Sequence, residues 1–355
     1  MGKVINGIQQ IGIGVADAKS VFNWYRKNLG FDILVFQDEA TASLMTKYTS
    51  GEPMDRYAIL AMNMTGGGGL EIWQFKNRVP EPPRTRMLLG DLGINIMKLR
   101  STDVVKCHKN LKINDLNSVT ELKNIDQNSK HFFFTDPWNN LIQIVSDDYC
   151  FNNSEANSGG VLGVSIGVSQ MENSIKFYRN LLGFDRMIYD RTNVFEDLKS
   201  LPGGSHSLRR VLLRRNFRKT GGFGELLGPC EIELLQVIDR EPVKIYKDRL
   251  WGDLGYIHIC FDIHGMNALR NDAEKLDYRF TVDSSDSFDM GGAAGHFSYI
   301  EDPDGTLIEF VETHKVPILK KLGIYINLKK RNPHRPLPKW LVQLMRVHRV
   351  KKDLN

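Results

Sequence analysis

The sequence contains no long apolar segment. Among its 355 residues there is no run of about 18 uncharged apolar residues, which is the length that a membrane-spanning helix needs. The first residues, Met1 to Gly7, also lack the apolar stretch of a secretion signal. We therefore expect a cytoplasmic protein without stable membrane insertion.

Cysteine is scarce, and its spacing excludes two kinds of scaffold. The four cysteines lie far apart, and no two of them are separated by only two residues. This spacing argues against a disulfide framework and against a zinc site made of thiolates. Free, buried thiols are expected at Cys107, Cys150, Cys230 and Cys260.

Acidic residues are nearly absent from the C-terminal end. Residues 313 to 355 hold twelve Lys and Arg but a single acid, Asp353, so this segment carries a formal charge of +11. Because the whole chain carries +5, the remainder carries −6. The basic character belongs to the tail, and we expect no nucleic-acid partner.

The sequence contains an internal repeat. Four short segments recur in the same order about 150 to 170 residues further along the chain. With 41% hydrophobic residues, the chain is long enough for two domains, each with its own core. We therefore interpret the two halves as duplicated domains. The matched segments are WYRKNLGFD at 24–32 with FYRNLLGFD at 177–185, GLEIWQ at 69–74 with EIELLQ at 231–236, GDLG at 90–93 with GDLG at 252–255, and DPWNNLIQ at 136–143 with DPDGTLIE at 302–309.

A polar stretch after residue 150 marks the join between the halves. The predicted order is a first domain at 1–150, a linker at 151–158, a second domain at 159–313, and a basic tail at 314–355 that contains a short helix.

Within each half, a strand, an amphipathic helix and several strands follow one another twice. Val21, Phe22, Tyr25 and Leu29 share one helix face, and Gly30 is placed to end that helix. The pattern predicts an α+β fold of four βαβββ modules.

The LGFD helix endings and the DPDGTLIE segment resemble those of the vicinal-oxygen-chelate superfamily, which includes glyoxalases, bleomycin-resistance proteins and extradiol dioxygenases. The resemblance covers about residues 5 to 313. It implies two tandem domains, each an open, curved, mixed sheet built from two modules. It also implies a metal in the concavity, with up to one ligand from the first strand and one from the last strand of each module.

In the first domain, the resemblance maps these positions to Gln10, Glu71, Ile96 and Gln143, with Asn95 as a substitute for Ile96. An amide is a weak metal ligand and isoleucine is none. We therefore expect a degenerate domain that has lost its metal and has a structural or pocket-shaping role.

In the second domain, the same positions fall on Gly163, Glu233, His258 and Glu309. An imidazole and two carboxylates suit a divalent Fe, Mn, Zn or Ni ion, with open positions for substrate oxygens or water. The resemblance therefore implies a metal site of Glu233, His258 and Glu309. Glu231 shares the strand face of Glu233 and is a rival for its place.

Three activities remain open. The first is a glyoxalase-like or epimerase-like lyase or isomerase that binds a small hydroxy- or keto-bearing acid or thioester through neighbouring oxygens, with Glu309 or Glu233 as base. His296 is a further candidate acid or base. The second is an extradiol or 2-oxo-acid dioxygenase, and Gly163 counts against it because dioxygenases of this family normally have histidine there. The third is a metal-free protein that binds a hydrophobic small molecule.

The tail contains one more amphipathic segment. Pro338 suits the first turn of a helix, and an apolar stripe follows it. We expect this stripe to pack on the acidic body of the protein or on a second subunit, which allows a homodimer. The stripe consists of Trp340, Leu341, Leu344 and Met345.

Overall fold

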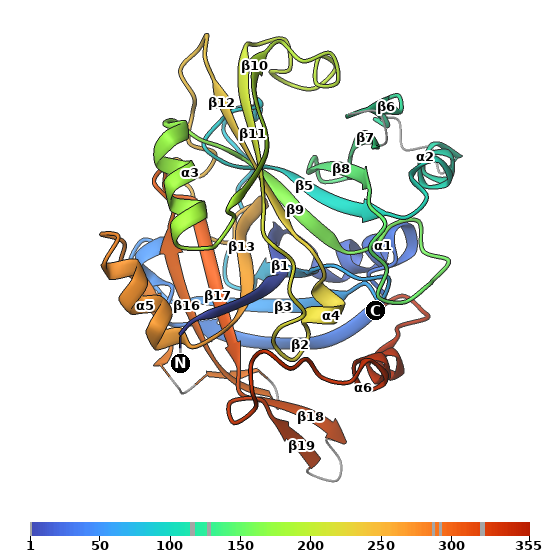
Figure 1. The fold of residues 1–355 in the computed structure, drawn as a ribbon, viewed down its shortest axis with the longest axis vertical. Coiled ribbons are helices and arrows are strands. Elements are labelled where there is room, and N and C mark those ends of the chain that lie inside the picture. Colours follow the sequence, from blue (N-terminus) through green and yellow to red (C-terminus); the bar gives the residue numbers. More distant parts are fainter. Residues whose placement is uncertain (1, 114–117, 126–128, 286–287, 291–292, 320–323) are drawn as a thin grey trace.

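The computed structural model describes residues 2–113, 118–125, 129–285, 288–290, 293–319 and 324–355. Two large sheets dominate the molecule, with helices packed against them (Figure 1). The predicted α+β fold, with four βαβββ modules that form open, curved, mixed sheets and a C-terminal extension, is confirmed.

The first and the last module together build one sheet, which we call sheet A. Its strand order is β14-β16-β17-β13-β1-β4-β3-β2, with β15 beside β16. At its centre, β1 and β13 pair antiparallel. The first module supplies β1 (Val4–Val15), β2 (Ile33–Ala42), β3 (Met54–Met62) and β4 (Gly69–Phe75). The last module supplies β13 (Gly255–His264), β14 (Val282–Asp283), β15 (Phe288–Met290), β16 (Ala293–Glu301) and β17 (Leu307–Thr313).

The two middle modules build the other sheet, sheet B. Its strand order is β10-β11-β12-β9-β5-β8-β7-β6, and the antiparallel pair β9 and β5 forms its centre. The second module supplies β5 (Gly93–Ser101), β6 (Lys123–Asn124), β7 (Lys130–Thr135) and β8 (Leu141–Ser146). The third module supplies β9 (Val161–Gly167), β10 (Arg186–Asn193), β11 (Leu208–Arg214) and β12 (Glu231–Val237).

The two sheets therefore do not follow the two halves of the sequence. Residues 1–150 and 159–313 are repeats, but each sheet takes one module from each of them. The segment 151–158 joins β8 to β9, which both lie in sheet B, so it does not separate two independent sheets. Because each sheet combines modules from both halves, this pairing determines in which sheet each candidate site residue lies.

The module helices form where the apolar spacing predicts them. In α1 (Ala18–Leu29), the carboxylate of Asp17 caps the first turn by accepting hydrogen bonds from the backbone N–H groups of Lys19 and Ser20. The helix ends at Gly30, whose φ of 79° is in the left-handed region that favours glycine. The predicted apolar face is fully buried and consists of Val21, Phe22, Tyr25 and Leu29.

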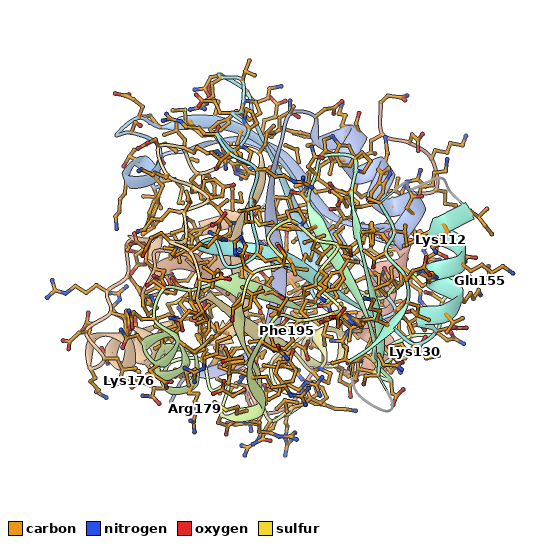
Figure 2. The ribbon with its side chains drawn as sticks, turned by 90° about the horizontal axis from the view of Figure 1, so that it is seen from above. Lys112, Lys130, Glu155, Lys176, Arg179 and Phe195 are labelled. Atoms are coloured by element: carbon orange, nitrogen blue, oxygen red, sulfur yellow. The ribbon has the colours of Figure 1, made fainter. Side chains whose placement is uncertain are left out.

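The remaining module helices are α2 (Val104–Ile113), α3 (Met171–Asn180) and α5 (Met266–Glu274). Their charged side chains lie at the periphery of the molecule, as Figure 2 shows for Lys112, Lys176 and Arg179. Their apolar side chains enter one continuous core that includes residues from both sheets. A single shared core explains why the modules of one sheet need not be neighbours in sequence.

The tail packs against the body along one side. β18 (Lys315–Leu319) and β19 (Ile324–Asn327) pair antiparallel, and α6 (Lys339–Gln343) continues into a 3-10 turn (Leu344–His348). Leu341 and Met345 of the predicted stripe pack on a cluster that contains Ile33 and α4 (Gly224–Leu227). Trp340 and Leu344 remain exposed, so only part of the stripe meets the body.

All four cysteines are free thiols, and they are buried except for Cys150. Within the described residues, no helix combines the length and the hydropathy required to cross a membrane.

Candidate metal centre

Four neighbouring strands of sheet A bring four polar side chains together. In the order β17, β13, β1 and β4, these strands carry Glu309, His258, Gln10 and Glu71. The register places Gly12 of β1 opposite His258 on one side and beside Glu71 on the other. Residues from the first and the last module therefore meet on one sheet face.

The four side chains converge on the imidazole. Its Nε2 atom lies 3.1 Å from Oε2 of Glu309 and 3.2 Å from Oε2 of Glu71. The amide nitrogen of Gln10 lies 3.5 Å and 3.4 Å from the same two oxygens. One ligand atom from each of Glu71, His258 and Glu309 can be chosen so that all lie within 4.8 Å of one another. The set offers one imidazole, two carboxylates and an amide.

The backbone of β1 makes room for the imidazole. A Cβ atom at Gly12 would lie 2.3 Å from Cε1 of His258, so no other residue fits there without displacing the ring. A register shift beside this pair inserts Ile257 as an extra residue in β13. Bulges of this kind redirect side chains near functional sites. Here Ile257 packs with the aromatic cluster around the site, whereas Tyr256 enters the helix-covered core.

The carboxylates stabilise positive charge at their centre. Burial opposes protonation of His258, but the nearby negative charges of Glu309 and Glu71 outweigh it and raise the pKa of His258 to about 9. Burial likewise opposes ionisation of Glu71, yet its contact with His258 keeps the Glu71 pKa below its usual value. The cluster thus holds two acidic groups and a single basic one. An excess of acidic groups favours a bound cation.

The geometry of the cluster fits a divalent metal ion. Two ligand atoms about 2.1 Å from one ion lie about 3.0 to 3.4 Å apart in octahedral or tetrahedral coordination. The separations of 3.1 Å and 3.2 Å at His258 fall in this range. In the described structure, neither ring nitrogen of His258 has a hydrogen-bond partner of acceptable geometry, and Oε1 of Gln10 is also buried without one. Buried polar atoms rarely stay unpaired, and a coordinated metal ion would satisfy these.

Aromatic side chains surround the cluster. The indole of Trp251 stacks on the imidazole of His258 with ring centres 6.4 Å apart and an interplanar angle of 17°. Tyr299 meets the same imidazole edge-on at 5.5 Å, and Trp73 packs against Trp251 at 4.5 Å. An apolar wall of this kind excludes water and strengthens every charge interaction inside it.

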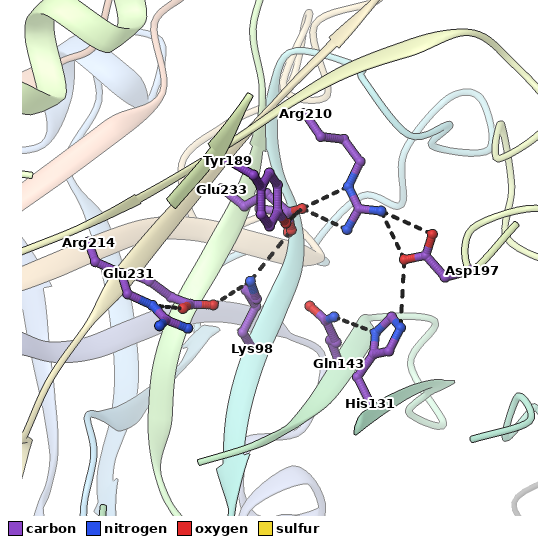
Figure 3. A network of polar contacts seen from close by, with 10 residues as sticks. Lys98, His131, Gln143, Tyr189, Asp197, Arg210, Arg214, Glu231 and Glu233 are labelled. Atoms are coloured by element: carbon purple, nitrogen blue, oxygen red, sulfur yellow. Dashed lines mark hydrogen bonds and ion pairs between the residues drawn. The ribbon is translucent and has the colours of Figure 1, made fainter. Parts of the chain in front are cut away.

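Glu233 does not join His258 and Glu309. It lies on β12 of sheet B, where its carboxylate accepts a hydrogen bond from Nε of Arg210 at 2.9 Å and lies 3.5 Å from Nζ of Lys98 (Figure 3). Although burial opposes it, the positive charges of Arg210 and Lys98 hold the Glu233 pKa well below its usual range. Further hydrogen bonds to Glu233 come from Tyr189 and Ser165, each at 2.7 Å. The carboxylate is fully engaged in this network.

The rival Glu231 belongs to the same network and not to the metal centre. Its carboxylate lies 2.5 Å from Nζ of Lys98 and 2.8 Å from Nε of Arg214 (Figure 3). Burial opposes its ionisation, but these two cations lower the pKa of Glu231. Sheet B therefore neutralises its buried acids with side-chain cations.

Sheet B holds the counterpart of the metal centre. By the repeat, Ile96, Gln143, Gly163 and Glu233 occupy the positions that His258, Glu309, Gln10 and Glu71 occupy in sheet A. Only Glu233 among them is a strong ligand, and Lys98 and Arg210 supply the positive charge beside it. Gln143 instead hydrogen bonds to His131 at 2.7 Å. The positions predicted to lack metal ligands at Ile96 and Gln143 lie in this sheet.

His296 also lies away from the metal centre. Its neighbours Phe297 and Tyr299 belong to the aromatic cluster of the site, whereas Ser298 contacts Met266 of α5. Since side chains alternate along a strand, His296 shares the helix-covered side with Ser298. Its Nε2 atom lies 2.6 Å from the carboxylate of Asp283, which is a structural pairing.

Glu71 and Gln10 were assigned to the degenerate half from sequence, but they complete the site. One signal was available in the sequence. If the first module pairs with the last, Glu71, His258 and Glu309 fall in one sheet. Of the strong metal ligands, Glu233 alone falls in the other sheet. That concentration distinguishes the observed pairing from pairing within each half.

Four βαβββ modules, and an imidazole held between two carboxylates on one curved sheet, define a protein of the glyoxalase and dioxygenase type. The sequence model described as "Glyoxalase/Bleomycin resistance protein/Dioxygenase superfamily" matches residues 7–144 and 160–310. The chain belongs to this superfamily.

Solved structures show the same fold at low sequence identity. Glyoxalase I from Zea mays aligns with a TM-score of 0.54 and 14% identity over 87% of this chain and 93% of that chain. A Bacillus subtilis protein provisionally assigned as a dioxygenase aligns with a TM-score of 0.54 and 14% identity over 87% and 85%. The sequence matches none of the curated proteins. These similarities establish the fold, and activity has to be argued from the site.

Proposed function

We propose that this protein is a divalent-metal-dependent lyase or isomerase that moves a proton within a small substrate bound through two neighbouring oxygens. One observation carries the proposal, the convergence of Glu71, His258 and Glu309 with all three ligand atoms within 4.8 Å. Gln10 is a fourth, weaker donor beside them. Fe, Mn, Zn and Ni all accept such a set.

A bound metal ion would polarise the substrate oxygens and lower the energy of an enolate or alkoxide. The proton needs a base of this chain. Glu71 and Glu309 come from strands on opposite sides of the central pair β1 and β13. Each carboxylate therefore faces the bound substrate from a different side and can accept or return a proton there. The aromatic wall of Trp251 and Tyr299 keeps water from the reactive carbanion.

A dioxygenase is the second candidate, favoured by the shared fold of the Bacillus subtilis protein. The composition of the site weighs against it, because the cluster contains one imidazole, His258, and two carboxylates. Iron in the purified protein, together with oxygen consumption on a catechol or a 2-oxo acid, would favour this candidate.

A metal-free binding protein is the third candidate. Its support is the close contact of His258 with Glu309 and Glu71, which also describes a protonated imidazole between two carboxylates. In that case added metal leaves the protein unchanged.

Metal content tests the proposal. The protein, purified without added metal, is compared with Glu71→Gln, His258→Ala and Glu309→Gln, and with Glu233→Gln as the matched control from sheet B. We expect about one metal ion per chain in the wild type and in the control, and a loss of at least about tenfold in the three cluster variants. Wild-type protein that neither contains nor takes up Fe(II), Mn(II), Zn(II) or Ni(II) contradicts the proposal.

Proton transfer is tested separately in D₂O. Hydroxy- and keto-bearing acids and thioesters are incubated with the metal-loaded protein, and deuterium at the carbon beside the carbonyl is followed by NMR. We expect incorporation with the wild type and its loss in Glu71→Gln or Glu309→Gln. Full metal content without exchange in any of these compounds removes the proton-transfer assignment while leaving the metal site intact.

A further inference from the structure

The basic tail presents a row of apolar side chains to solvent. The row lies on α6 and the 3-10 turn that follows it, at the periphery of the molecule (Figure 1). Trp340, Leu344 and Val347 are 63%, 45% and 77% exposed. Steps of four and then three residues along a helical segment place these side chains on one face.

Another face of the same segment anchors it to the body of the protein. Val342 is only 2% exposed, and Leu341 and Met345 pack on the cluster to which Val342 belongs. Leu337, just before α6, lies in the same cluster. Because these contacts fix the rotation of the segment, the apolar row is held facing outward.

The charge around the row is positive and mostly not neutralised. Residues 335–352 contain six Lys and Arg and no acid, and all six are exposed. Within the described structure, one of the six forms an ion pair, Arg349 with Asp32. The next acid along the chain, Asp353, is itself paired with Arg26. The five other cations are Arg335, Lys339, Arg346, Lys351 and Lys352.

Exposed apolar side chains among cations match the surface of a membrane that contains anionic lipids. Negative headgroups attract the cations, and an apolar helix face enters the boundary between headgroups and acyl chains. Tryptophan is enriched at this boundary. Lys339 and Arg346 lie on the helical segment itself, and their described partners, the ring of Phe151 and the amide of Asn152, are uncharged.

A second copy of the chain or a nucleic acid fits this surface less well. In a closed dimer the same patch would face itself, so the cations of both copies would meet. Three apolar side chains are also few beside the roughly 20 to 30 residues that each partner brings to a stable interface. A nucleic acid would pair with the cations, but its polar surface offers little to Leu344 and Val347.

We propose that residues 335–352 bind the surface of a membrane that contains anionic lipids. The apolar row enters the interface, and the five cations meet the headgroups. The segment lies on the membrane without crossing it, because α6 and the 3-10 turn contain five residues each, whereas a span needs about 20. This binding is independent of the metal centre and of the proposed enzymatic activity.

Vesicle flotation tests the proposal. The full-length protein is mixed with vesicles of phosphatidylcholine alone or of phosphatidylcholine with about 30% phosphatidylserine. We expect at least about tenfold tighter binding to the anionic vesicles, and a loss of about tenfold when NaCl is raised from about 0.05 M to about 0.5 M. No binding to anionic vesicles at low salt, or equal binding to both kinds, overturns the proposal.

Variants locate the binding surface. Trp340→Ser with Leu344→Ser shortens the apolar row, and Lys351→Gln with Lys352→Gln removes two cations. Each double variant should weaken vesicle binding by about five- to tenfold. All four side chains are exposed, so the variants should keep the urea unfolding midpoint of the wild type.

Matched controls carry the same kinds of change elsewhere. Val79→Ser replaces an apolar side chain that is 83% exposed, and Lys106→Gln with Lys109→Gln removes two exposed cations of α2. Both controls should bind vesicles as the wild type does. Equal weakening in the controls contradicts the assigned surface.

Trp340 also reports the contact directly. Lipids with brominated acyl chains quench an indole that enters the membrane, so we expect quenching in the wild type and its loss in Trp340→Phe, which should still float. Quenching that persists in Trp340→Phe contradicts the proposed orientation. A dimer that dissociates in Trp340→Ser with Leu344→Ser, measured by analytical ultracentrifugation, would assign the row to a second copy. Duplex DNA that binds while anionic vesicles do not would assign the cations to nucleic acid.

Discussion

Tyr25 of α1 donates a buried hydrogen bond of 2.7 Å to Asp136, and the same contact recurs between Tyr178 of α3 and Asp302 at 3.0 Å. Each pair connects two of the sequence segments by which the repeat is recognised. α1 belongs to the first module and Asp136 to the second, so the first bond links sheet A to sheet B. The second bond links the sheets again through the third and fourth modules.

Replacement of either tyrosine by phenylalanine should destabilise the protein without affecting the metal centre. Tyr25→Phe and Tyr178→Phe should each lower the free energy of unfolding by about 1 kcal/mol, since Asp136 keeps its hydrogen bonds from Asn140. Urea unfolding measures the effect, and metal content should stay at the wild-type value. Unchanged unfolding midpoints would show that these hydrogen bonds do not stabilise the contact between the sheets.

A side chain at Gly12 should disrupt the metal centre. In Gly12→Ala, the added methyl would lie 2.3 Å from the imidazole of His258, so we expect a loss of about 1 to 3 kcal/mol in stability and a fall in metal content. Ser165 occupies the equivalent place in sheet B. Ser165→Ala is therefore the control, and it should keep full metal content. A metal-replete Gly12→Ala protein would argue against His258 as a ligand.

The buried ion pairs of sheet B should matter for stability and not for metal. Among the described residues, Glu233→Gln leaves the buried Arg210 with one acidic partner, Asp197 at 2.8 Å. Breaking one partner of a buried pair costs about 3 to 5 kcal/mol. We expect a loss near the lower end, about 3 kcal/mol, in chemical unfolding, because glutamine retains hydrogen bonding. A fall in metal content in the folded variant would assign Glu233 to the metal site after all.

Asp262 should make stability depend on pH. Burial raises the pKa of this carboxyl to about 7, although a hydrogen bond from Asn6 opposes the shift. Because the folded state holds the proton more tightly than the unfolded chain, this group's contribution is fully present below about pH 4. It is lost as pH rises toward 7, by about 1.4 kcal/mol per pH unit at most.

The matched variant for this effect is Asp262→Asn, which cannot ionise. Its free energy of unfolding, measured from pH 5 to pH 8, should fall less steeply than that of the wild type. Parallel pH profiles of the two proteins would show that Asp262 is ionised in the folded state throughout this range.

The sequence alone predicted those parts of the fold that depend on contacts between residues close together in the chain. The apolar spacing from Val21 to Leu29 and the stop at Gly30 depend on contacts within one helix, and the structure confirms them. The candidate ligands His258 and Glu309 came instead from the family resemblance, mapped onto this chain through the internal repeat, and the structure brings both side chains into one cluster. Glu71 was recognised as occupying a ligand position but was assigned to the wrong partners.

Which modules pair with each other could not be predicted from patterns within short segments of the sequence. Chain entropy discriminates weakly between a short and a long connection, since each doubling of a loop costs only about 0.6 kcal/mol. The choice is decided instead where β1 meets β13 and β9 meets β5. At the first contact Gly12 admits the ring of His258, and at the second Lys98 lies opposite Gly163. Complementarity of this kind joins residues that are far apart in the sequence and leaves no periodic pattern.

The order of the modules in the sequence also determines which sheet can form first during synthesis. As the chain leaves the ribosome from its N-terminus, sheet B has all its strands once residue 237 has emerged, whereas β1 must wait for β13, which begins at Gly255. Until then the first module exposes an unpaired strand edge, the kind of edge that recruits foreign strands. Sheet B can therefore form first. Gln10 and Glu71 are the first residues of the metal centre to be synthesised, but the centre is complete only when His258 and Glu309 have followed.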